Sequence, residues 1–439
     1  MQSILPFIVV LGVIIFVHEF GHFIVAKSFG MRVFIFSFGF GRRLLGVKWG
    51  DTDYRISLIP LGGYVKLEGE PEDHLSDDTT TLGDGKDFTV RPRWQRIAVY
   101  LAGPAMNAVL TIGVMTVLYM IGFGEPASLY DPPLVGVVAA GSPAEAAGLK
   151  PGDLILTIDG KPQPNWQSVL YSIALRPSTT VRLQVRRDGE TRDLVAQSGV
   201  TSDRIGTIGI GPTVRIQEVR PGTPAEQAGL KVGDAILKVG DKYIAHADDV
   251  SPAVQATEGR EIPVQISRAA QTMTFPMVPA RQDGAYRIGI TVGGGDIIPR
   301  KFGPAGAFVA ACRWSWERTQ QIGEVLGRLL TARLSPKTVA GPLGIAQESG
   351  KAARSGPVAF FLFLAFISLN VGLLNLFPLP PLDGGHLAIL AGESVIRRDF
   401  SATVKAWILN AGAVAILLLV ALVLYSDFSK ISLLKKFLP

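Results

Sequence analysis

The chain has 439 residues, of which 48% are hydrophobic and 18% are charged. This balance is typical of a membrane protein that carries soluble domains. The formal net charge of +6 comes without a basic run interleaved with aromatic residues, which argues against a nucleic-acid partner and favours contact with anionic membrane lipid. The single cysteine, Cys312, excludes an internal disulfide.

The first apolar segment, residues 4–26, carries the sequence His18-Glu19-Phe20-Gly21-His22. On a helix, His18 and His22 project from one face and can bind a metal ion, while Glu19 is a candidate general base. Such polar residues at bilayer depth are costly unless they are coordinated or paired, so they indicate a functional site. The alternative is a signal peptide or simple anchor, which the lack of a basic leader and of a small-residue cleavage site disfavours.

Four segments are long and apolar enough to cross a bilayer, which needs about 20 residues. The second contains Gly103-Pro104 and Asn107, and the third contains Asn370 and Asn375. A lone amide most often bonds a neighbouring helix, but three of them beside the histidines predict a shared polar site. Basic residues place the loop after the first span and the loop between the last two spans in the cytoplasm, with both termini outside. The segments are 4–26, 97–123, 358–377 and 406–424.

The region 39–67 is too rich in glycine and too alternating for a helix. We expect two strands, 54–59 and 64–67, joined through 60–63. A hairpin with an exposed edge can accept an extended peptide as a further strand, whereas the simpler interpretation is an ordinary cytoplasmic hairpin. Residues 68–87 are acidic and rich in glycine and threonine, which is typical of a solvated loop.

An internal duplication follows the second span, because residues 141–156 and 222–237 share one pattern of Gly-Ser/Thr-Pro-Ala-Glu, Gly-Leu-Lys and Gly-Asp. Both copies resemble the signature of PDZ domains. Each copy is followed by a short strand flanked by glycine, at 208–210 and at 288–290, which looks like a carboxylate-binding loop in a circularly permuted domain. The two domains either bind peptide ends by strand addition or restrict access to the membrane site by size. Residues 302–335 then predict an amphipathic helix on the membrane surface, or one packed on these domains.

A catalytic zinc typically has three protein ligands and keeps one position for water. The remaining histidines are His74, His246 and His386, and only His386 lies near an apolar span. Asp383 stands three residues before it, so the spacing allows either residue as the third ligand. The simplest alternative for Asp383-Gly384-Gly385 is a turn closed by an Asx hydrogen bond.

Three motifs together resemble the site-2 protease family of intramembrane zinc metalloproteases, in particular its regulator-of-sigma-E type with tandem PDZ domains. They are His-Glu-Phe-Gly-His in the first span, Gly-Pro with Asn107 in the second, and Asn375 to Gly385 with the pattern N-x-x-P-x-P-x-L-D-G-G. The resemblance implies that His18, His22 and Asp383 ligate Zn²⁺ and that Glu19 is the base. It implies substrate-binding or site-shaping roles for Asn107, Asn375, Pro378 and Pro380, and a substrate clamp in the hairpin at Ile56, Ser57, Leu58 and Ile59.

The resemblance also implies the setting: a multi-pass protein of the bacterial inner membrane, with PDZ domains in the periplasm and the active site toward the cytoplasm. The implied substrates are single-span membrane proteins, namely an anti-sigma factor after a first cleavage and remnant signal peptides. The expected fold is a polytopic α-helical membrane protein with four transmembrane helices, a membrane-associated β-hairpin and two inserted α+β PDZ domains. The expected domains are 1–26, first transmembrane helix; 27–94, cytoplasmic loop with the re-entrant hairpin; 95–124, second helix; 130–212 and 213–293, PDZ domains; 302–335, surface helix; 357–392, third helix; and 404–426, fourth helix.

Two other classes of protein share some of these features. A membrane zinc protease acting on lipidated or soluble C-termini also places HExxH near a bilayer, but it does not predict PDZ domains between the metal motifs. A non-enzymatic membrane scaffold would be favoured if Glu19 or a metal ligand were missing, and all of them are present.

Overall fold

The computed structural model describes residues 3–430 apart from 70–84, 127–128, 131, 202–204, 213, 245–246, 269–270, 283, 294–296, 332–333 and 335–340. Most of the expected acidic loop, with His74, and also His246 lie outside the described residues. The chain divides into two compact units. The membrane unit comprises Met1–Phe123, Lys301–Gly327 and Val339–Pro439, and the inserted unit comprises Gly124–Arg300 and Arg328–Thr338.

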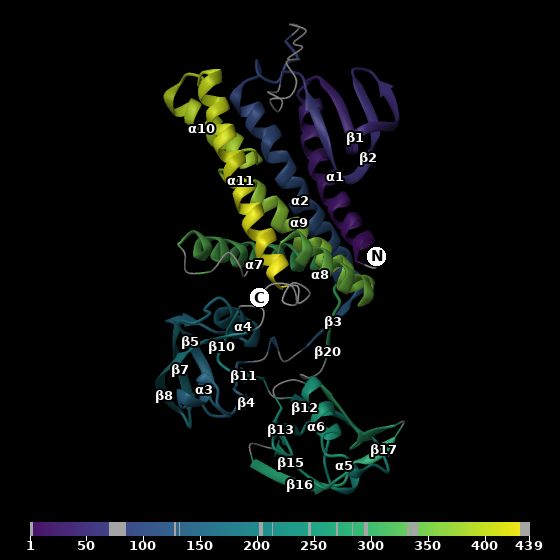
Figure 1. The fold of residues 1–439 in the computed structure, drawn as a ribbon, viewed down its shortest axis with the longest axis vertical. Coiled ribbons are helices and arrows are strands. Elements are labelled where there is room, and N and C mark those ends of the chain that lie inside the picture. Colours follow the sequence, from purple (N-terminus) through teal and green to yellow (C-terminus); the bar gives the residue numbers. More distant parts are fainter. Residues whose placement is uncertain are drawn as a thin grey trace, which may run out of the picture. The chain divides into compact units, whose positions relative to one another are not determined.

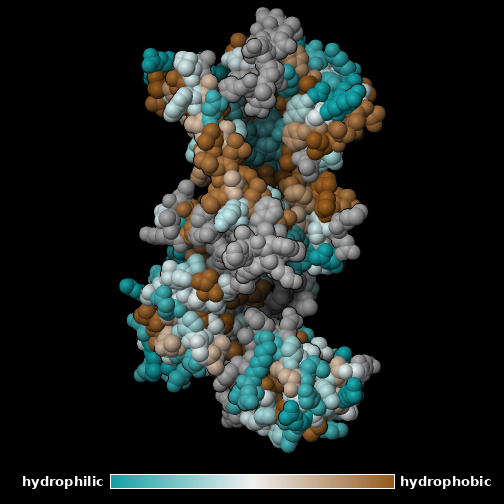
Figure 2. Space-filling model, in the orientation of Figure 1, coloured by the Kyte–Doolittle hydropathy of each residue, from teal (hydrophilic) through white to brown (hydrophobic). Residues whose placement is uncertain are grey.

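The four expected spans are helices that are long and apolar enough to cross a membrane, within the described part of the chain. Their outer surface is apolar: on the last of them, Leu417 and Leu418 are each about two-thirds exposed at 68% and 66%. Figure 2 shows hydrophobic residues gathered over these helices. An apolar surface of this extent suits contact with lipid. The helices, labelled in Figure 1, are α1 Ile4–Ser28, α2 Arg93–Ile121, α9 Pro357–Asn375 and α11 Ala402–Lys430.

Helix α2 packs against both α1 and α9 (Figure 1). Glycines allow this close approach: a Cβ added to Gly21 of α1 would lie 2.8 Å from Cγ of Met106 on α2. On the other side, a Cβ added to Gly372 of α9 would lie 3.0 Å from Cβ of Asn107. Small residues at membrane-helix interfaces bring backbones together, so polar groups on neighbouring helices come within bonding distance.

The segment expected as one third transmembrane helix, residues 357–392, consists of two helices. Helix α9 ends at Asn375, and α10 is a separate helix from Asp383 to Ile396. Three prolines lie between them, and proline lacks an N–H and clashes with the preceding turn, so one helix cannot continue through this stretch. The break makes Asp383 the first residue of α10, where the helix dipole stabilises a carboxylate.

Residues 33–67 form a sheet in which the predicted hairpin is wrong: segments 54–59 and 64–67 belong to one strand and pair with residues 33–49 rather than with each other. Strand β1 Val33–Trp49 pairs with β2 Thr52–Leu67. Gly39 and Gly41 have φ of +92° and +85°, a conformation that glycine adopts without strain, and β1 bends there. Each bent strand contributes two segments, so the order across the sheet is 63–67, 33–38, 53–57 and 43–49.

The free edges of this sheet are not where the hairpin prediction placed one. Arg55 and Ile56 have neighbours on both sides, because Ile56 pairs with Phe38 and with Leu45. The prediction of an exposed edge in strand 54–59 is therefore wrong at these two residues, since the bend in β1 brings its two halves to opposite sides of them. Among the described residues, segments 63–67 and 43–49 each pair on one side only and form the edges.

Aromatic side chains fasten this sheet to α1. The ring of Phe23 stacks on Phe36 at 4.7 Å, and Phe16 meets Phe38 edge to face at 5.6 Å. A Cβ added to Gly12 of α1 would lie 3.4 Å from the carbonyl oxygen of Pro60. Aromatic pairs of this kind contribute about 0.5–1.5 kcal/mol each beyond the area they bury, so the sheet is held beside the helix that carries the histidines.

Two further helices complete the membrane unit. Helix α7, Pro304–Leu330, corresponds to the predicted amphipathic helix over the residues described. Ala307 of α7 is fully buried in a cluster with residues of α2 and α9, whereas Trp316 is 64% exposed. This division into a buried and an apolar exposed face suits a helix at a membrane surface. Helix α8, Pro342–Arg354, which was not predicted, packs against α1.

In the inserted unit, each sequence repeat forms an α+β module around its own apolar core. The first repeat has the strand order β6-β5-β7-β8, and the second has β16-β15-β13-β12-β19 with β14 beside β13. The elements of the first repeat are β4 Val137–Val138, α3 Pro143–Ala146, β5 Leu154–Ile158, β6 Lys161–Pro162, α4 Trp166–Ala174, β7 Thr180–Arg187, β8 Glu190–Gln197, β9 Gly199–Val200, β10 Gly206–Thr207 and β11 Ile210–Gly211. Those of the second are β12 Val214–Val219, α5 Pro224–Gln227, β13 Ala235–Val239, β14 Lys242–Tyr243, η2 Ala247–Asp249, α6 Val250–Gln255, β15 Ile262–Arg268, β16 Gln271–Met277, β17 Ala280–Gln282, β18 Ala285–Arg287 and β19 Ile290–Gly293. Strands β3 Phe123–Pro126 and β20 Ile297–Arg300 pair with each other.

The duplication extends from the sequence to the contacts. In the first repeat, the buried carboxylate of Asp153 accepts two hydrogen bonds from Arg187, at 2.6 and 2.7 Å. In the second, Asp234 accepts two from Arg268, at 2.7 and 2.6 Å. Each aspartate follows a glycine in the repeated motif, and each arginine lies on the strand that pairs beside it. The Gly-Asp signature thus marks a bidentate ion pair that fixes the turn before a core strand.

Candidate metal centre

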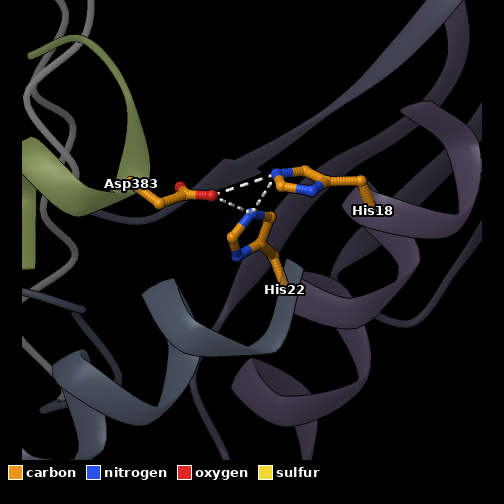
Figure 3. A group of neighbouring side chains, drawn as sticks. All are labelled: His18, His22 and Asp383. Atoms are coloured by element: carbon orange, nitrogen blue, oxygen red, sulfur yellow. Dashed lines mark hydrogen bonds and ion pairs between the residues drawn. The ribbon is translucent and has the colours of Figure 1, made fainter. Parts of the chain in front are cut away.

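His18, His22 and Asp383 meet inside the membrane unit, as Figure 3 shows. The two histidines lie one turn apart on α1 and are 7% and 9% exposed, and Asp383 enters from the first turn of α10. The Nε2 atoms of the histidines are 3.2 Å apart. The Asp383 Oδ2 atom lies 3.0 Å from Nε2 of His18 and 3.5 Å from Nε2 of His22.

The dimensions of this triangle fit a zinc ion. Tetrahedral zinc with ligand bonds of about 2.0–2.2 Å has ligand atoms separated by about 3.3–3.6 Å, close to the three distances observed. Apart from the imidazoles, Asp383 Oδ2 is buried without a hydrogen-bond partner among the described residues. Two imidazole nitrogens and one carboxylate oxygen are a donor set that catalytic zinc sites use, with a fourth position left for water.

Helix α2 reaches this triangle because of a glycine. A Cβ added to Gly103 would lie 2.7 Å from Nε2 of His18, and closer still to Nε2 of His22. Any larger residue at position 103 would therefore occupy the space between the ligand atoms. The sequence presents Gly103-Pro104 as a part of the motif in the second span, whereas the place of Gly103 against the ligand atoms depends on the packing of α1 against α2.

A cavity of about 300 Å³ opens beside the triangle. Glu19 lines this cavity together with Val65 of β2 and Asn375 at the end of α9. His386 also lines it, but its ring stacks on Tyr100 at 4.8 Å and does not join the three ligand atoms. The structure therefore groups Asp383, rather than His386, with the two histidines.

The other predicted site residues lie at different positions around the ligand triangle and do not all face the cavity. Pro380 is buried in the break between α9 and α10, and its carbonyl lies against Gly412 of α11, whereas Pro378 is exposed. Asn107 is fully buried behind His18 and does not line the cavity. Ser57 is buried and shares a hydrogen bond of 2.8 Å with the hydroxyl of Ser37, so its side chain is not available to a substrate.

The apolar hairpin residues of the prediction are exposed side chains on the sheet. Ile56, Leu58 and Ile59 are 49%, 58% and 46% exposed. Sequence reasoning missed the segment of the sheet that lines the cavity, which is Val65 to Leu67. It also missed Tyr100 and the carbonyl of Val99, which accepts a hydrogen bond of 2.8 Å from His22 Nδ1. Main-chain partners of this kind leave no signal in a single sequence.

Known proteins are similar in sequence to this chain over almost its full length. The model of Peptidase family M50 matches residues 6–419. The "Regulator of sigma-E protease RseP" of Escherichia coli (strain K12) is 33% identical over 453 residues, which cover 97% of this chain and 98% of that protein. The "Protease RseP" of Yersinia pestis is 32% identical, and a "Putative zinc metalloprotease" of Vibrio cholerae serotype O1 is 31% identical; each match covers 98% of this chain and 99% of the relative.

The chain therefore belongs to peptidase family M50, and it is a zinc-dependent intramembrane metalloprotease of the site-2 type. Several relatives that it matches over nearly their full length are named regulator of sigma-E protease, and this similarity assigns it to regulation of the envelope stress response. The family, the enzyme class and the zinc cofactor that the sequence motifs implied are thus confirmed.

Proposed function

We propose that His18, His22 and Asp383 hold the zinc ion and that Glu19 is the general base for hydrolysis of peptide bonds within transmembrane segments. The observation that carries this proposal is the convergence of three ligand atoms beside a cavity that Glu19 also lines. When bound, zinc supplies Lewis-acid activation of water and of the scissile carbonyl. The Glu19 carboxylate takes the proton of the attacking water and then delivers it to the leaving amine nitrogen.

The cavity offers one further polar group for the substrate backbone. Asn375 ends α9 and lines the cavity, so its side-chain amide can donate a hydrogen bond to a substrate carbonyl. The prolines that follow Asn375 stop the helix and let Asp383 approach from a new direction. We therefore assign Asn375 to substrate binding, and Pro378 and Pro380 to shaping the turn that presents the metal ligand.

A transmembrane substrate must be unwound before its carbonyls can be attacked, because a helix keeps them bonded internally. Lipid cannot replace those hydrogen bonds, but a strand edge can. The edge beside the cavity is segment 63–67, whose residues Val65 and Leu67 line it. We propose that the substrate pairs with this edge. Ile56, Leu58 and Ile59 contribute exposed apolar side chains that contact the substrate or lipid rather than main-chain hydrogen bonds.

The cellular setting proposed for this activity follows from the charge distribution and from the names of the relatives. Basic residues after the first span and between α10 and α11 support cytoplasmic loops, with the inserted unit in the periplasm and both termini outside. The bacterial inner membrane is the location, and the substrates are single-span membrane proteins: an anti-sigma factor after a first cleavage, and remnant signal peptides. The support for these substrates is the similarity to regulator-of-sigma-E proteases.

We further propose that the two α+β modules of the inserted unit are PDZ domains. Their shared motif and their matching Asp–Arg ion pairs support a common fold. Two roles are distinguished by experiment. Peptide-end binding predicts saturable affinity of the modules for C-terminal peptides, whereas a size filter predicts that deleting residues 130–293 permits cleavage of substrates with large external domains.

The function is tested with purified full-length protein and a reporter that contains one transmembrane segment. Zinc content and cleavage within the segment are measured together, before and after chelation. The proposal expects about one zinc per chain and a loss of cleavage on chelation that added zinc restores. Cleavage only outside the segment, or activity unaffected by chelation, would contradict it.

A further inference from the structure

Each histidine of the candidate metal centre has a partner at the nitrogen that faces away from the ligand triangle. For His22, Nδ1 lies 2.8 Å from the carbonyl oxygen of Val99. A carbonyl oxygen only accepts, so Nδ1 of His22 carries the proton and Nε2 is left with a lone pair. For His18, Nδ1 lies 3.2 Å from the side-chain amide nitrogen of Asn107.

The two amide atoms of Asn107 have opposite consequences for His18. A neutral imidazole has one N–H, so a lone pair on Nε2 requires the proton on Nδ1 and an acceptor facing it. The amide nitrogen cannot accept this proton, but the amide oxygen can. In the structure, Asn107 Oδ1 is buried without a hydrogen-bond partner among the described residues. A half turn of the amide exchanges the two atoms and brings Oδ1 to the Nδ1 position.

Asn107 is held in place for this contact. Asn107 is 0% exposed. Its main-chain carbonyl accepts hydrogen bonds of 2.9 Å from the hydroxyl of Ser368 and of 2.9 Å from the hydroxyl of Thr111. A Cβ on Gly372 would lie 3.0 Å from its Cβ, so α9 closes over it. Because Asn107 does not line the cavity, its side chain faces His18 and not a substrate.

We propose that Asn107 is a positioning residue for the metal, whose Oδ1 accepts the Nδ1 proton of His18 and keeps His18 Nε2 unprotonated and directed at the zinc. This inference rests on the ligand set proposed above. It replaces the substrate-binding role that the sequence motif implied for Asn107. Loss of such a partner behind a metal-bound histidine typically costs about 10–100-fold in metal affinity.

The test measures zinc affinity of the full-length protein by competition with a chelator. A Glu19→Gln background keeps the measurement independent of cleavage. Asn107→Leu removes both amide atoms at similar volume, and Asn107→Asp keeps acceptor oxygens but has no N–H donor. Thr111→Val is the control for packing around Asn107, because Thr111 is equally buried one turn along and donates to the main-chain carbonyls of Asn107 and Ala365, so the change leaves the side-chain amide of Asn107 intact.

We expect Asn107→Leu to weaken zinc binding by about 10–100-fold, and Asn107→Asp and Thr111→Val to stay within about threefold of the parent. Equal affinity of Asn107→Leu and the parent overturns the inference. Weak binding by Asn107→Asp overturns it also, and this comparison remains decisive if the leucine variant does not fold. An equal loss of zinc affinity in Thr111→Val would also overturn the inference, because the loss would then come from packing and not from the amide of Asn107. Failure of the parent to bind zinc would overturn the ligand set, and this inference with it.

Discussion

Gly63 lies beside Glu19: a Cβ added to Gly63 would be 3.8 Å from Cγ of the glutamate. The same glycine pairs with Phe38 in the sheet, and the chain beyond it runs along the cavity as Val65 and Leu67. A free strand edge therefore starts next to the proposed base. A substrate paired with that edge would bring its backbone, rather than a side chain, to the zinc ligands.

Glu19→Gln is the test of the base. The three proposed ligands are unchanged, so zinc should remain bound, while cleavage of a transmembrane reporter should fall by about 10²–10⁴-fold because no carboxylate takes the proton. Zinc content and initial rates on the same preparation measure both effects. A rate within about tenfold of the unmodified protein would remove Glu19 from this role.

The third ligand is tested by Asp383→Ala beside His386→Ala. Asp383 supplies an oxygen to the ligand triangle, whereas His386 stacks on Tyr100 outside it. We expect the first variant to lose zinc and activity and the second to keep its zinc. Metal analysis after dialysis against a weak chelator separates them, and the reverse pattern would transfer the ligand role to His386.

The substrate edge is tested with proline. Successive N–H groups of a strand point to opposite sides, so either Val65 or Lys66 directs its N–H to the free edge. Proline at that residue should keep zinc but reduce cleavage of a helical transmembrane reporter by about tenfold, the value of one lost hydrogen bond. A soluble, unfolded peptide should be affected less, because it needs no unwinding.

Val65→Ile is the conservative control for this series and should be mild. Ile56→Pro, in the doubly paired part of the sheet, should instead lower the amount of folded protein, because it removes a donor from the interior. If both edge prolines act equally on helical and unfolded reporters, the edge does not hold the substrate.

Membrane orientation is tested by cysteine labelling after Cys312→Ser. Asp188 lies in the exposed turn between β7 and β8, and Arg398 lies in the exposed loop between α10 and α11. With an impermeant thiol reagent added outside intact spheroplasts, a cysteine at 188 should react and one at 398 should react only after lysis. Labelling in the opposite order would put the inserted unit in the cytoplasm.

The ion pair of the second repeat gives a pH-dependent stability. Burial alone would raise the pKa of Asp234, but hydrogen bonds from Arg268 and from the main-chain N–H of Lys231, together with the positive charges of these two residues, outweigh burial and lower the pKa below its ordinary value. A carboxyl group with a lower pKa in the folded state stabilises the fold above its unfolded pKa, and that stabilisation is lost as the pH falls toward the folded pKa. The protection of strand β15 from hydrogen exchange in the full chain, relative to an unfolded peptide at the same pH, should therefore fall below about pH 4.

Asp234→Asn should remove most of this dependence and lower the stability of the second repeat at neutral pH, because Arg268 loses its charged partner. Asp241→Asn is the matched control, since the Asp241 side chain is fully exposed and its ion pair with Lys238 is 3.9 Å long. Equal exchange rates in the two variants at pH 7 would contradict the assignment.

Much of the site could be predicted from the sequence because its signals are local. The four-residue spacing of His18 and His22 fixes their common face on a helix, and the apolar length of the spans identifies the helices. The repeated Gly-Asp motif predicts two modules from self-similarity of the sequence alone. Each of these inferences needs only periodicity or self-similarity.

The features that could not be predicted from the sequence depend on contacts between distant parts of the chain. The position of the sheet edge is set by the bend at Gly39 and Gly41, which a pattern of alternating residues does not reveal. The choice between Asp383 and His386 depends on where the proline break directs α10. The contact of Asn107 with His18 depends on the close approach of α1 and α2, which Gly21 allows.

The proposed ligands on α1 and on α10 lie far apart in the sequence, and this separation has a consequence while the chain is being synthesised. Ribosomes add about 5–20 residues per second, so a growing chain carries His18 and Glu19 for roughly twenty to seventy seconds before Asp383 is made. The proposed zinc site needs the carboxylate as its third ligand, and α10 must also be in place to present it. With this ligand set, a nascent chain lacks a complete zinc site, and proteolytic competence would arise only when nearly the whole polypeptide has been made.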